Sequence, residues 1–294
     1  MKRQKAEWLM IAVTLCWGSS YLFMQYGLNA IDEFNLIALR FGFAFLVTAS
    51  LFFKHIRKTN LPTIKYGAYL GFLLFCIFTC ITFGLKTTTT SNAGFLVSLT
   101  VIFVPFIYVL VFKRKPHPSL IVGVSLAFIG MGLLTLNSQL HIYPGDLLCI
   151  LSALFYAVYI ILTGTAAKKV DSLNLGIWQL GFAGALGLFF SFIFETPSLP
   201  ATLNGWISIL VLSFVCSAFG FVVQPLAQKY TTPTRTGLIF ALEPVFAALF
   251  GFLFAHEILP LRGYIGAAIV LIGVVVSDWQ GKRKNREHTL GNPS

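Results

Sequence analysis

The chain has 294 residues, of which 57% are hydrophobic and only 11% are charged. A soluble domain carries about a quarter charged residues and cannot hide so much apolar surface in one core. The composition therefore excludes a soluble globular protein and indicates an integral membrane protein.

The apolar residues fall in long blocks, each long enough to be a membrane-spanning helix. About 20 apolar residues cross a hydrocarbon layer of ~30 Å. The sequence predicts ten spans, at 7–28, 34–53, 66–85, 91–112, 118–136, 145–167, 173–194, 205–228, 234–256 and 259–279. The alternating pattern of a membrane β-barrel is not seen in the sequence. No small-residue cleavage site follows the first block, so we expect a mature first span and not a signal peptide.

The net charge of +11 follows the predicted topology. Basic residues cluster at the N-terminus, in alternate loops and in the tail, and only Arg40, Lys86 and Arg262 fall elsewhere. Short loops rich in Lys and Arg stay in the cytoplasm. Both termini are therefore predicted to be cytoplasmic, and nucleic acid is not an expected partner.

Two passages of the chain resemble each other, LKTTTTSNAGFLVSL at 85–99 and AQKYTTPTRTGLIFAL at 227–242. They align without a gap over 86–130 and 229–273, and earlier TLCWGSSY (14–21) aligns loosely with SALFYAVY (152–159). The polar and glycine identities in the long alignment are Lys86/Lys229, Thr88/Thr231, Thr89/Thr232, Gly94/Gly237, Gly123/Gly266 and Gly130/Gly273. We interpret this as two repeats, 1–137 and 138–279, followed by a polar cytoplasmic tail at 280–294 with little structure.

Each repeat holds five predicted spans, and five is an odd number. The second repeat must then enter the membrane from the opposite side, and inverted repeats of this kind are typical of secondary transporters. The predicted fold is an all-α membrane protein with ten transmembrane helices in two inverted five-helix repeats.

The segments GLKTTTTSNAGFLVSLTVIFVPF and AQKYTTPTRTGLIFALEPVFAALFGFLFAHE resemble the paired signature segments of the drug/metabolite transporter (DMT) superfamily, specifically its EamA-type ten-helix members. LIALRFGFAFL and WGSSYLFMQYGL are also similar to that family. The resemblance implies a carrier in a bacterial plasma membrane, commonly an exporter of amino acids, other metabolites or drugs. One departure is Arg114, which stands where the first repeat of the family usually has an acidic residue matching Glu257.

Two charged residues lie inside predicted spans. A carboxylate at the depth of Glu243 is expensive in a membrane and is a candidate functional group. It could bind a proton or a substrate ammonium group, or it could anchor backbone groups freed near Pro244. Arg40 could bind a substrate carboxylate, snorkel outward, or play a structural role such as pairing with Glu243.

Polar and aromatic side chains within spans are expected to face protein or a central cavity, because lipid would leave their polar groups unsatisfied. Helix–helix hydrogen bonding is the alternative role for each of them. The candidate cavity residues are Trp17, Tyr21, Gln25, Asn92, Tyr159, Trp178, Gln179 and Gln224, with Ser20, Ser98, Tyr156 and Thr163 as further members. The glycines that recur seven residues apart, Gly123/Gly130 and Gly266/Gly273, are expected to pack the fifth span against its neighbours and the tenth likewise.

The leading functional hypothesis is a secondary carrier for a small-molecule substrate that works by alternating access. An intramembrane enzyme is not expected, because all histidines lie in loops, at span ends or in the tail, and neither a metal site nor a cofactor is indicated. A channel would carry a repeated pore signature, and no ATP-binding loop appears in the sequence. Few fixed charges among many aromatic and amide groups favour efflux of amino acids or similar metabolites. The alternatives are a multidrug or cationic-metabolite carrier, or an importer, and proton coupling through Glu243 is a further hypothesis.

Overall fold

The computed structural model describes residues 1–88, 90–113, 118–135, 143–255 and 260–290, and the side chains of 90–92, 134–135, 251, 254–255 and 277–290 lie outside that description. In these ranges the chain is helical, without a strand. The elements are α1 (Arg3–Gly18), α2 (Ser20–Leu28), α3 (Glu33–Leu51), α4 (Phe53–Ile56), α5 (Leu61–Leu85), α6 (Thr90–Ser98), α7 (Thr100–Phe112), α8 (Pro118–Thr135), α9 (Pro144–Ala166), α10 (Ser172–Phe194), α11 (Leu203–Leu210), the π-helix η1 (Val211–Phe219), α12 (Gly220–Gln228), α13 (Pro233–Phe240), α14 (Glu243–Ala255) and α15 (Leu261–Leu290).

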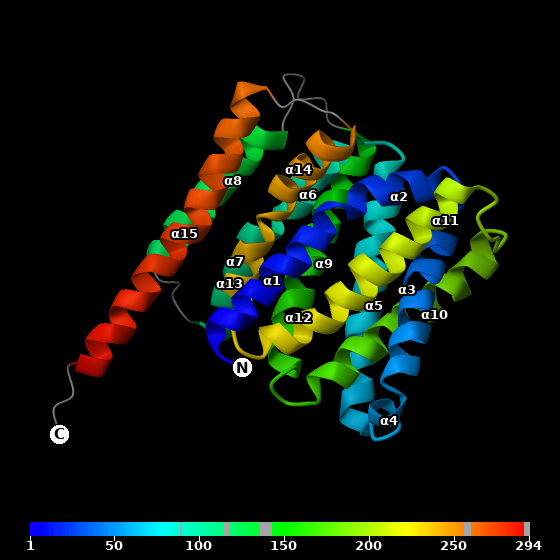
Figure 1. Ribbon diagram of the computed structural model, residues 1–294, viewed down its shortest axis with the longest axis horizontal. Coiled ribbons are helices and arrows are strands. Elements are labelled where there is room, and N and C mark those ends of the chain that lie inside the picture. The colour runs from blue at the N-terminus through cyan, green and yellow to red at the C-terminus, as the bar shows by residue number, and fades with distance from the viewer. Residues whose placement is uncertain (89, 114–117, 136–142, 256–259, 291–294) are drawn as a thin grey trace.

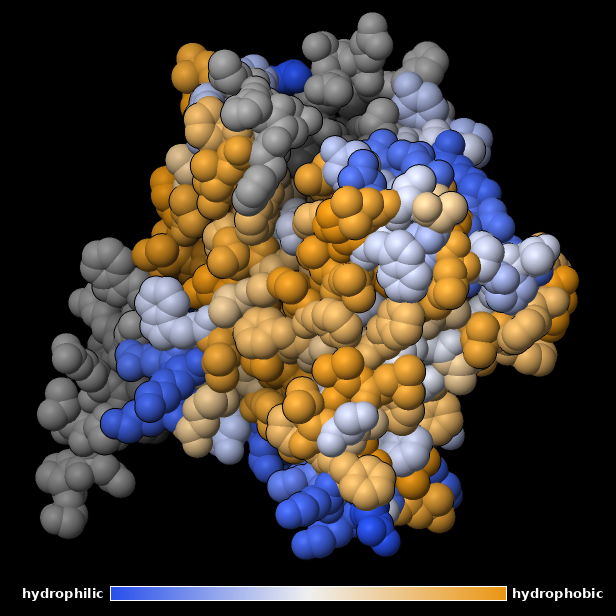
Figure 2. All heavy atoms as spheres, turned by 45° about the vertical axis from the view of Figure 1, so that its right-hand side comes forward, coloured by the Kyte–Doolittle hydropathy of each residue, from blue (hydrophilic) through white to orange (hydrophobic). Residues whose placement is uncertain are grey.

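The predicted spans correspond to these helices. Among the described residues, 7 helices are long and apolar enough to cross a membrane, and 118–133 and 261–276 are shorter apolar helices. The remaining predicted span, 234–256, consists of α13 and α14, which a short turn separates. Hydrophilic residues gather toward the two ends of the molecule, and an apolar surface lies between them (Figure 2). This distribution fits a bundle whose sides face lipid.

The tail differs from the prediction. The segment 280–294 was expected to carry little structure, but α15 continues to Leu290. Its sequence explains the difference, since Lys, Arg, Gln and Glu are good helix formers and the first proline after the span is Pro293.

The passages that begin the two similar segments lie at opposite ends of the bundle (Figure 1). One end, where α5 leads into α6, is called here the Lys86 end. The other, where α12 leads into α13 and the N-terminus also lies, is the Lys229 end. The repeats therefore run in opposite directions through the bundle.

Helix contacts follow the same two-fold relation between the repeats. In the first repeat α1 packs on α12 and α14, and in the second the corresponding α9 packs on α5 and α7. Likewise α3 contacts η1, and its counterpart α10 contacts α5. Two interfaces join an element to its own counterpart, α3 with α10 and α8 with α15. The contact of α7 with α13 has its mate in the contact of α14 with α6. Exchanging the repeats leaves this pattern of neighbours unchanged.

Glycine contacts at α8 and α15 show the relation at the level of single residues. A Cβ atom on Gly130 would lie 2.6 Å from the carbonyl oxygen of Gly266, and one on Gly273 would lie 2.7 Å from that of Gly123. These two contacts exchange when the repeats are exchanged. The seven-residue glycine pairs therefore bring α8 and α15 backbone to backbone.

The α3–α10 interface is built in the same way. A Cβ on Gly184 would meet the Gly42 backbone nitrogen at 2.8 Å, and one on Gly181 would meet the ring of Phe45 at 2.9 Å. Gly181 corresponds to Gly42, and Gly184 corresponds to Phe45. Exchanging the repeats therefore turns the contact of Gly184 with Gly42 into the contact of Phe45 with Gly181. The same correspondence aligns α3 with α10 along their lengths, beginning at their N-cap residues Asp32 and Asp171.

We expect Gly184→Ala to destabilise the bundle, because the new methyl group would press on the α3 backbone at 2.8 Å. Overpacking of this kind costs about 1–3 kcal/mol. Gly42→Ala is the matched control on the same interface, since a Cβ there meets nothing within 4 Å. Its expected effect is neutral, or a gain of up to ~1 kcal/mol in helix propensity. Thermal unfolding of both variants in mild detergent tests the pair, and equal melting temperatures would contradict the interface.

Candidate functional site

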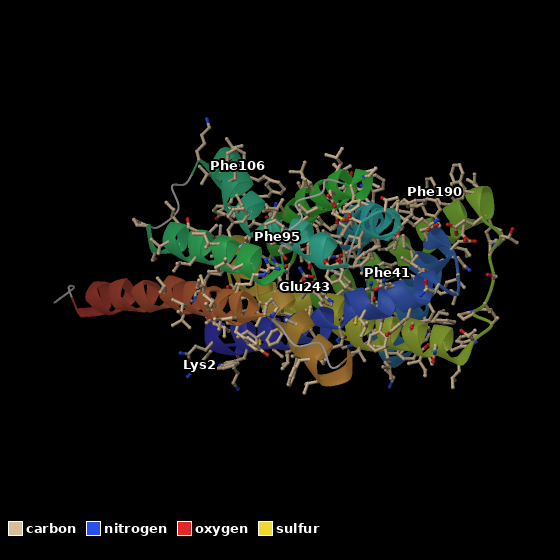
Figure 3. All side chains as sticks on the ribbon, turned by 90° about the horizontal axis from the view of Figure 1, so that it is seen from above. Lys2, Phe41, Phe95, Phe106, Phe190 and Glu243 are labelled. Atoms are coloured by element: carbon tan, nitrogen blue, oxygen red, sulfur yellow. The ribbon has the colours of Figure 1, made fainter. Side chains whose placement is uncertain are left out.

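A small cavity lies inside the bundle, with walls from both repeats. Its volume is about 30 Å³, enough for about one or two waters. The lining residues are Trp17, Ser20, Tyr21, Met24, Arg40, Ile77, Phe78, Ile81, Val97, Tyr156, Phe221 and Glu243. Seen from above, Glu243 lies at the centre of the bundle, whereas Phe106 lies at its periphery (Figure 3). Of the predicted site residues, Trp17, Tyr21, Arg40 and Glu243 are brought together here.

Arg40 is the cation of the cavity wall. It is 1% exposed, and its Nε donates a hydrogen bond to Ser217 Oγ at 2.7 Å. Its guanidinium carbon lies 4.2 Å from the centre of the Phe78 ring and 5.3 Å from that of Phe41. The Nη1 atom is buried and has no hydrogen-bond partner within the described part of the chain. An arginine held in this way presents a free donor to an anionic group.

Glu243 is the acidic residue of the wall, and a break in the helix determines its position. After α13 ends at Phe240, Ala241 and Leu242 bond back to the third residue before each, and α14 begins at Glu243 itself. Pro244 cannot donate a backbone hydrogen bond, so its place in the first turn of a new helix leaves no further donor unpaired. The carboxylate thus sits at the positive end of the α14 dipole. In the described residues it makes no ion pair with Arg40, so that predicted pairing is not present in this structure.

The first repeat has a corresponding break without a carboxylate. Leu99, the counterpart of Leu242, separates α6 from α7. Thr100 stands where Glu243 stands in the second repeat, and its hydroxyl donates to the carbonyls of Val97 at 2.6 Å and Ala153 at 3.2 Å. Both repeats therefore have the helix break, but the side chain after it is a hydroxyl in the first repeat and a carboxyl group in the second.

The π-helix η1 supplies the support behind Arg40. Its wider turn carries Ser217, which accepts from Arg40, and the Cys216 carbonyl, which accepts from Trp17 Nε1 at 2.8 Å. A Cβ on Gly220 would lie 2.4 Å from Trp17 Nε1, so this indole position requires glycine opposite it. Segments of π-helix are frequent at functional sites. The sequence contains no turn signal that predicts this one.

Aromatic rings enclose the cavity on one side. The Trp17 ring lies 4.8 Å from that of Phe221, 4.9 Å from that of Phe240 and 6.1 Å from that of Tyr156. The Tyr156 and Phe240 rings are stacked at 5.9 Å. This arrangement supplies π-faces next to the carboxylate of Glu243, a combination that suits a cationic group.

Tyr159, Gln179 and Gln224 lie in a separate polar network and do not line the cavity. The Tyr159 hydroxyl contacts Gln179 Oε1 at 2.9 Å and Gln224 Oε1 at 3.2 Å. Gln179 donates to the Phe221 carbonyl at 2.7 Å, and Gln224 donates to Gln228, which donates to the Ile160 carbonyl. All four side chains are completely buried. Their hydrogen bonds join α9, α10 and α12.

The other predicted site residues lie elsewhere. Gln25 is exposed on α2. Trp178 donates from Nε1 to Thr59 Oγ1 at 3.2 Å and packs on Gly67 of α5, away from the cavity. The side chain of Asn92 lies outside the described residues, as do Arg114 and Glu257.

The Lys86 end is closed by polar contacts between helix ends. Lys86 forms an ion pair with Glu33, and Thr88 donates to Asp146. Glu195, which follows α10, accepts from the backbone amides of Phe34 and Asn35 in α3, both at 2.8 Å. These contacts tie the starts of α3 and α9 to the ends of α5 and α10.

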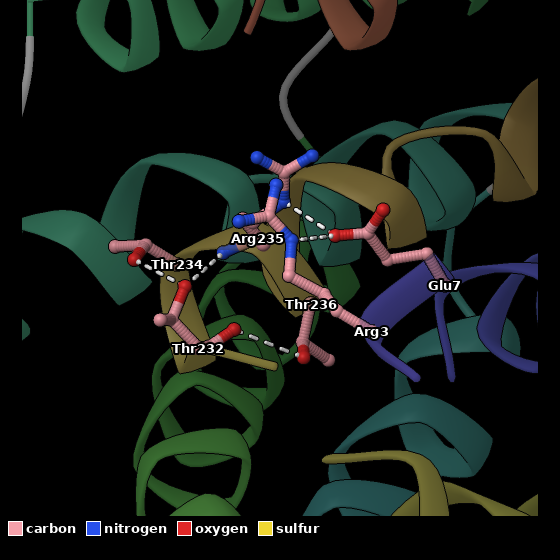
Figure 4. A network of polar contacts seen from close by, with 6 residues as sticks. All are labelled: Arg3, Glu7, Thr232, Thr234, Arg235 and Thr236. Atoms are coloured by element: carbon pink, nitrogen blue, oxygen red, sulfur yellow. Dashed lines mark hydrogen bonds and ion pairs between the residues drawn. The ribbon is translucent and has the colours of Figure 1, made fainter. Parts of the chain in front are cut away.

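A second network closes the Lys229 end (Figure 4). Glu7 of α1 accepts from Arg3 Nε at 2.9 Å and from Arg235 Nε of α13 at 2.8 Å. The Thr232 hydroxyl caps α13 by accepting from the Arg235 amide at 3.4 Å. Polar contacts thus join helices at both ends of the bundle.

The sequence of this chain matches a known family in both repeats. The description of the EamA-like transporter family fits residues 4–136 and 143–277. The chain belongs to the EamA-like transporter family. The resemblance seen in the sequence is confirmed, and the protein is a multi-pass membrane transporter with small-molecule cargo.

Several proteins described as uncharacterized transporters are similar to this chain. Two uncharacterized transporters of Archaeoglobus fulgidus are 30% and 31% identical to this EamA-like transporter, and the matches cover 94% and 92% of this chain and 86% and 96% of theirs. The uncharacterized transporter YoaV of Bacillus subtilis is 23% identical over 94% of this chain and 97% of its own. A solved crystal structure has the same fold, with a TM-score of 0.80, 18% identity and coverage of 96% of this chain and 99% of that one.

Proposed function

We propose that the protein is a secondary carrier that exports amino acids or similar zwitterionic metabolites by alternating access. The observation that carries this proposal is the pair of opposite charges in one central cavity, Arg40 from the first repeat and Glu243 from the second. They are the charged residues in its wall. A zwitterion offers a carboxylate to the free Arg40 Nη1 and an ammonium group to Glu243, so each buried charge would gain a partner on binding.

The size of the cavity supports a closed resting form of such a carrier. About 30 Å³ holds a water or two and no amino acid. In this proposal the ion pairs Lys86–Glu33 and Glu7–Arg235 act as the closures at the two ends. Substrate entry would then require one set of contacts to open while the other stays closed, which is the order of events in alternating access.

We further propose that the membrane is a bacterial plasma membrane with both termini in the cytoplasm. The basic loops support this orientation. In it, the Lys229 end faces the cytoplasm and the Lys86 end faces outward. A proton that binds Glu243 when substrate leaves would couple transport to the proton gradient.

A carrier of cationic metabolites is the second candidate, because the rings of Trp17 and Tyr156 lie beside Glu243 in the same cavity. A cation would use these rings and the carboxylate and would leave Arg40 without a partner. The two candidates differ in whether the substrate needs a carboxylate.

Transport in proteoliposomes distinguishes them. The purified full chain is reconstituted and loaded in turn with labelled neutral amino acids, the matching decarboxylated amines, and a cationic dye, with and without a pH gradient. We expect concentrative movement of amino acids and little movement of the amines. Preferred movement of amines and dye would favour the cationic candidate, and no movement above empty liposomes for any of them would contradict the zwitterion proposal.

A further inference from the structure

The two repeats place equivalent residues in two different chemical environments. The α3–α10 glycine contacts make Gln179 the counterpart of Arg40, and the alignment of the first and sixth spans makes Tyr159 the counterpart of Tyr21. The ends of α5 at Leu85 and of α12 at Gln228 are also counterparts. On that pairing Phe221 matches Phe78, and Gln224 matches Ile81.

The first set of residues surrounds the cavity, and the second set is closed. Tyr21, Arg40, Phe78 and Ile81 all line the cavity. Their counterparts Tyr159, Gln179 and Gln224 do not line this cavity; they are completely buried, and the Tyr159 hydroxyl contacts both amides. Three of these four positions thus line the cavity in the first repeat and form a buried polar network in the second, whereas Phe78 and its counterpart Phe221 both line the cavity.

The two sets also lie toward opposite ends of the bundle. Ile81 is near the end of α5 that reaches the Lys86 end, and Met24 is near the end of α2 on the same side. Gln224 hydrogen-bonds Gln228, the last residue of α12, at the Lys229 end. A two-fold exchange of the repeats would carry the cavity from one end to the other.

We propose that Tyr159, Gln179 and Gln224 form a second half-site, which is closed in this structure and opens toward the Lys229 end when the Arg40 cavity is closed. The proposal rests on the alternating-access function proposed above. It follows from the near-equivalence of inverted repeats, since each repeat can adopt the conformation that its counterpart has here.

The chemistry of this second half-site is neutral. It offers a phenol hydroxyl and two carboxamides, which donate and accept hydrogen bonds and carry no charge. Its ligands are therefore polar uncharged or zwitterionic groups, which would replace the bonds that the three side chains now make to one another. The Lys229 side holds substrate by hydrogen bonds, whereas the Lys86 side adds the guanidinium of Arg40.

Thiol accessibility tests the proposal without knowledge of the substrate. Gln224→Cys is compared with Ile81→Cys, its matched position in the first repeat, in right-side-out and inverted membrane vesicles. The probe is a membrane-impermeant, positively charged methanethiosulfonate reagent, and the wild-type chain corrects for its five native cysteines. A state populated at only ~1–10% still exposes a thiol to such a reagent.

We expect the reagent to label the added thiol of Gln224→Cys completely when it is applied from the side of the Lys229 end. We expect it to label that of Ile81→Cys completely when it is applied from the opposite side. Reaction of Ile81→Cys alone would overturn the second half-site and leave the carrier function standing. Reaction of both from one face would overturn both. Reaction of neither would overturn the half-site, and transport by the same preparations would decide the function separately. If Gln224→Cys does not fold, as judged by size-exclusion chromatography, Gln179→Cys takes its place with the same expectations.

Discussion

Arg40→Leu is expected to reduce the apparent affinity for a carboxylate-bearing substrate by about 10- to 100-fold. A hydrogen bond to a charged group contributes about 1.5–3 kcal/mol, and 1.4 kcal/mol corresponds to a factor of ten. The guanidinium is buried, supported by Ser217 and the Phe78 ring, and its Nη1 is open to a ligand. Leucine removes the charge while leaving an apolar side chain among the rings. Transport assays in proteoliposomes measure the change in KM.

Two comparisons make this result specific. The decarboxylated amine of the same substrate has no group for Arg40 and should lose little affinity in the variant. Arg57→Leu is the matched protein control, because Arg57 also lies over a phenylalanine ring, that of Phe53 at 5.7 Å, but is exposed and outside the cavity. Equal losses for acid and amine, or for both arginine variants, would argue against a carboxylate subsite.

Glu243→Gln is expected to abolish accumulation driven by a pH gradient while retaining exchange of substrate down its own gradient. The amide has nearly the same shape as the carboxylate but cannot take up and release a proton, and Glu243 is the acidic side chain of the cavity wall. We expect the dependence on the pH gradient to fall to background. Asp32→Asn, at an exposed position before α3, is the control and should behave as wild type. Concentrative, pH-dependent transport by Glu243→Gln at the wild-type level would remove the proton-coupling role.

The architecture could be predicted from the sequence because a membrane imposes strong constraints. Blocks of about 20 apolar residues mark spans, and the Lys-x-Thr-Thr repeats at Lys86 and Lys229 mark the repeat. The charged wall residues were predictable for a related reason. A charge such as that of Arg40 or Glu243 is rare inside a membrane, so its presence points to protein-facing surroundings.

The apolar part of the cavity wall could not be predicted. Ile77, Phe78 and Ile81 line the cavity, yet they do not differ in sequence from the many apolar residues that face lipid. The glutamine side chains were correctly expected to face the protein interior, but their partners could not be predicted. Gln179 and Gln224 are turned inward as polarity requires, but only the positions of α9 and α12 decide that they bond to Tyr159 and not to a cavity. The helix break at Ser19 directly follows Gly18, so a sequence signal was present there. The π-helix η1 directly follows neither a glycine nor a proline.

The self-paired interfaces, α3 with α10 and α8 with α15, contain the approximate rotation axis that relates the repeats. Points on an axis move least when two bodies rock about it, and displacement grows with the length of the lever arm. Backbone contacts as tight as that of Gly130 with the Gly266 carbonyl tolerate only small movements. The glycine contacts therefore lie near the axis, where we expect the smallest displacement. The peripheral helix ends that carry Glu33 and Glu7 lie farther from the axis, and we expect them to move most.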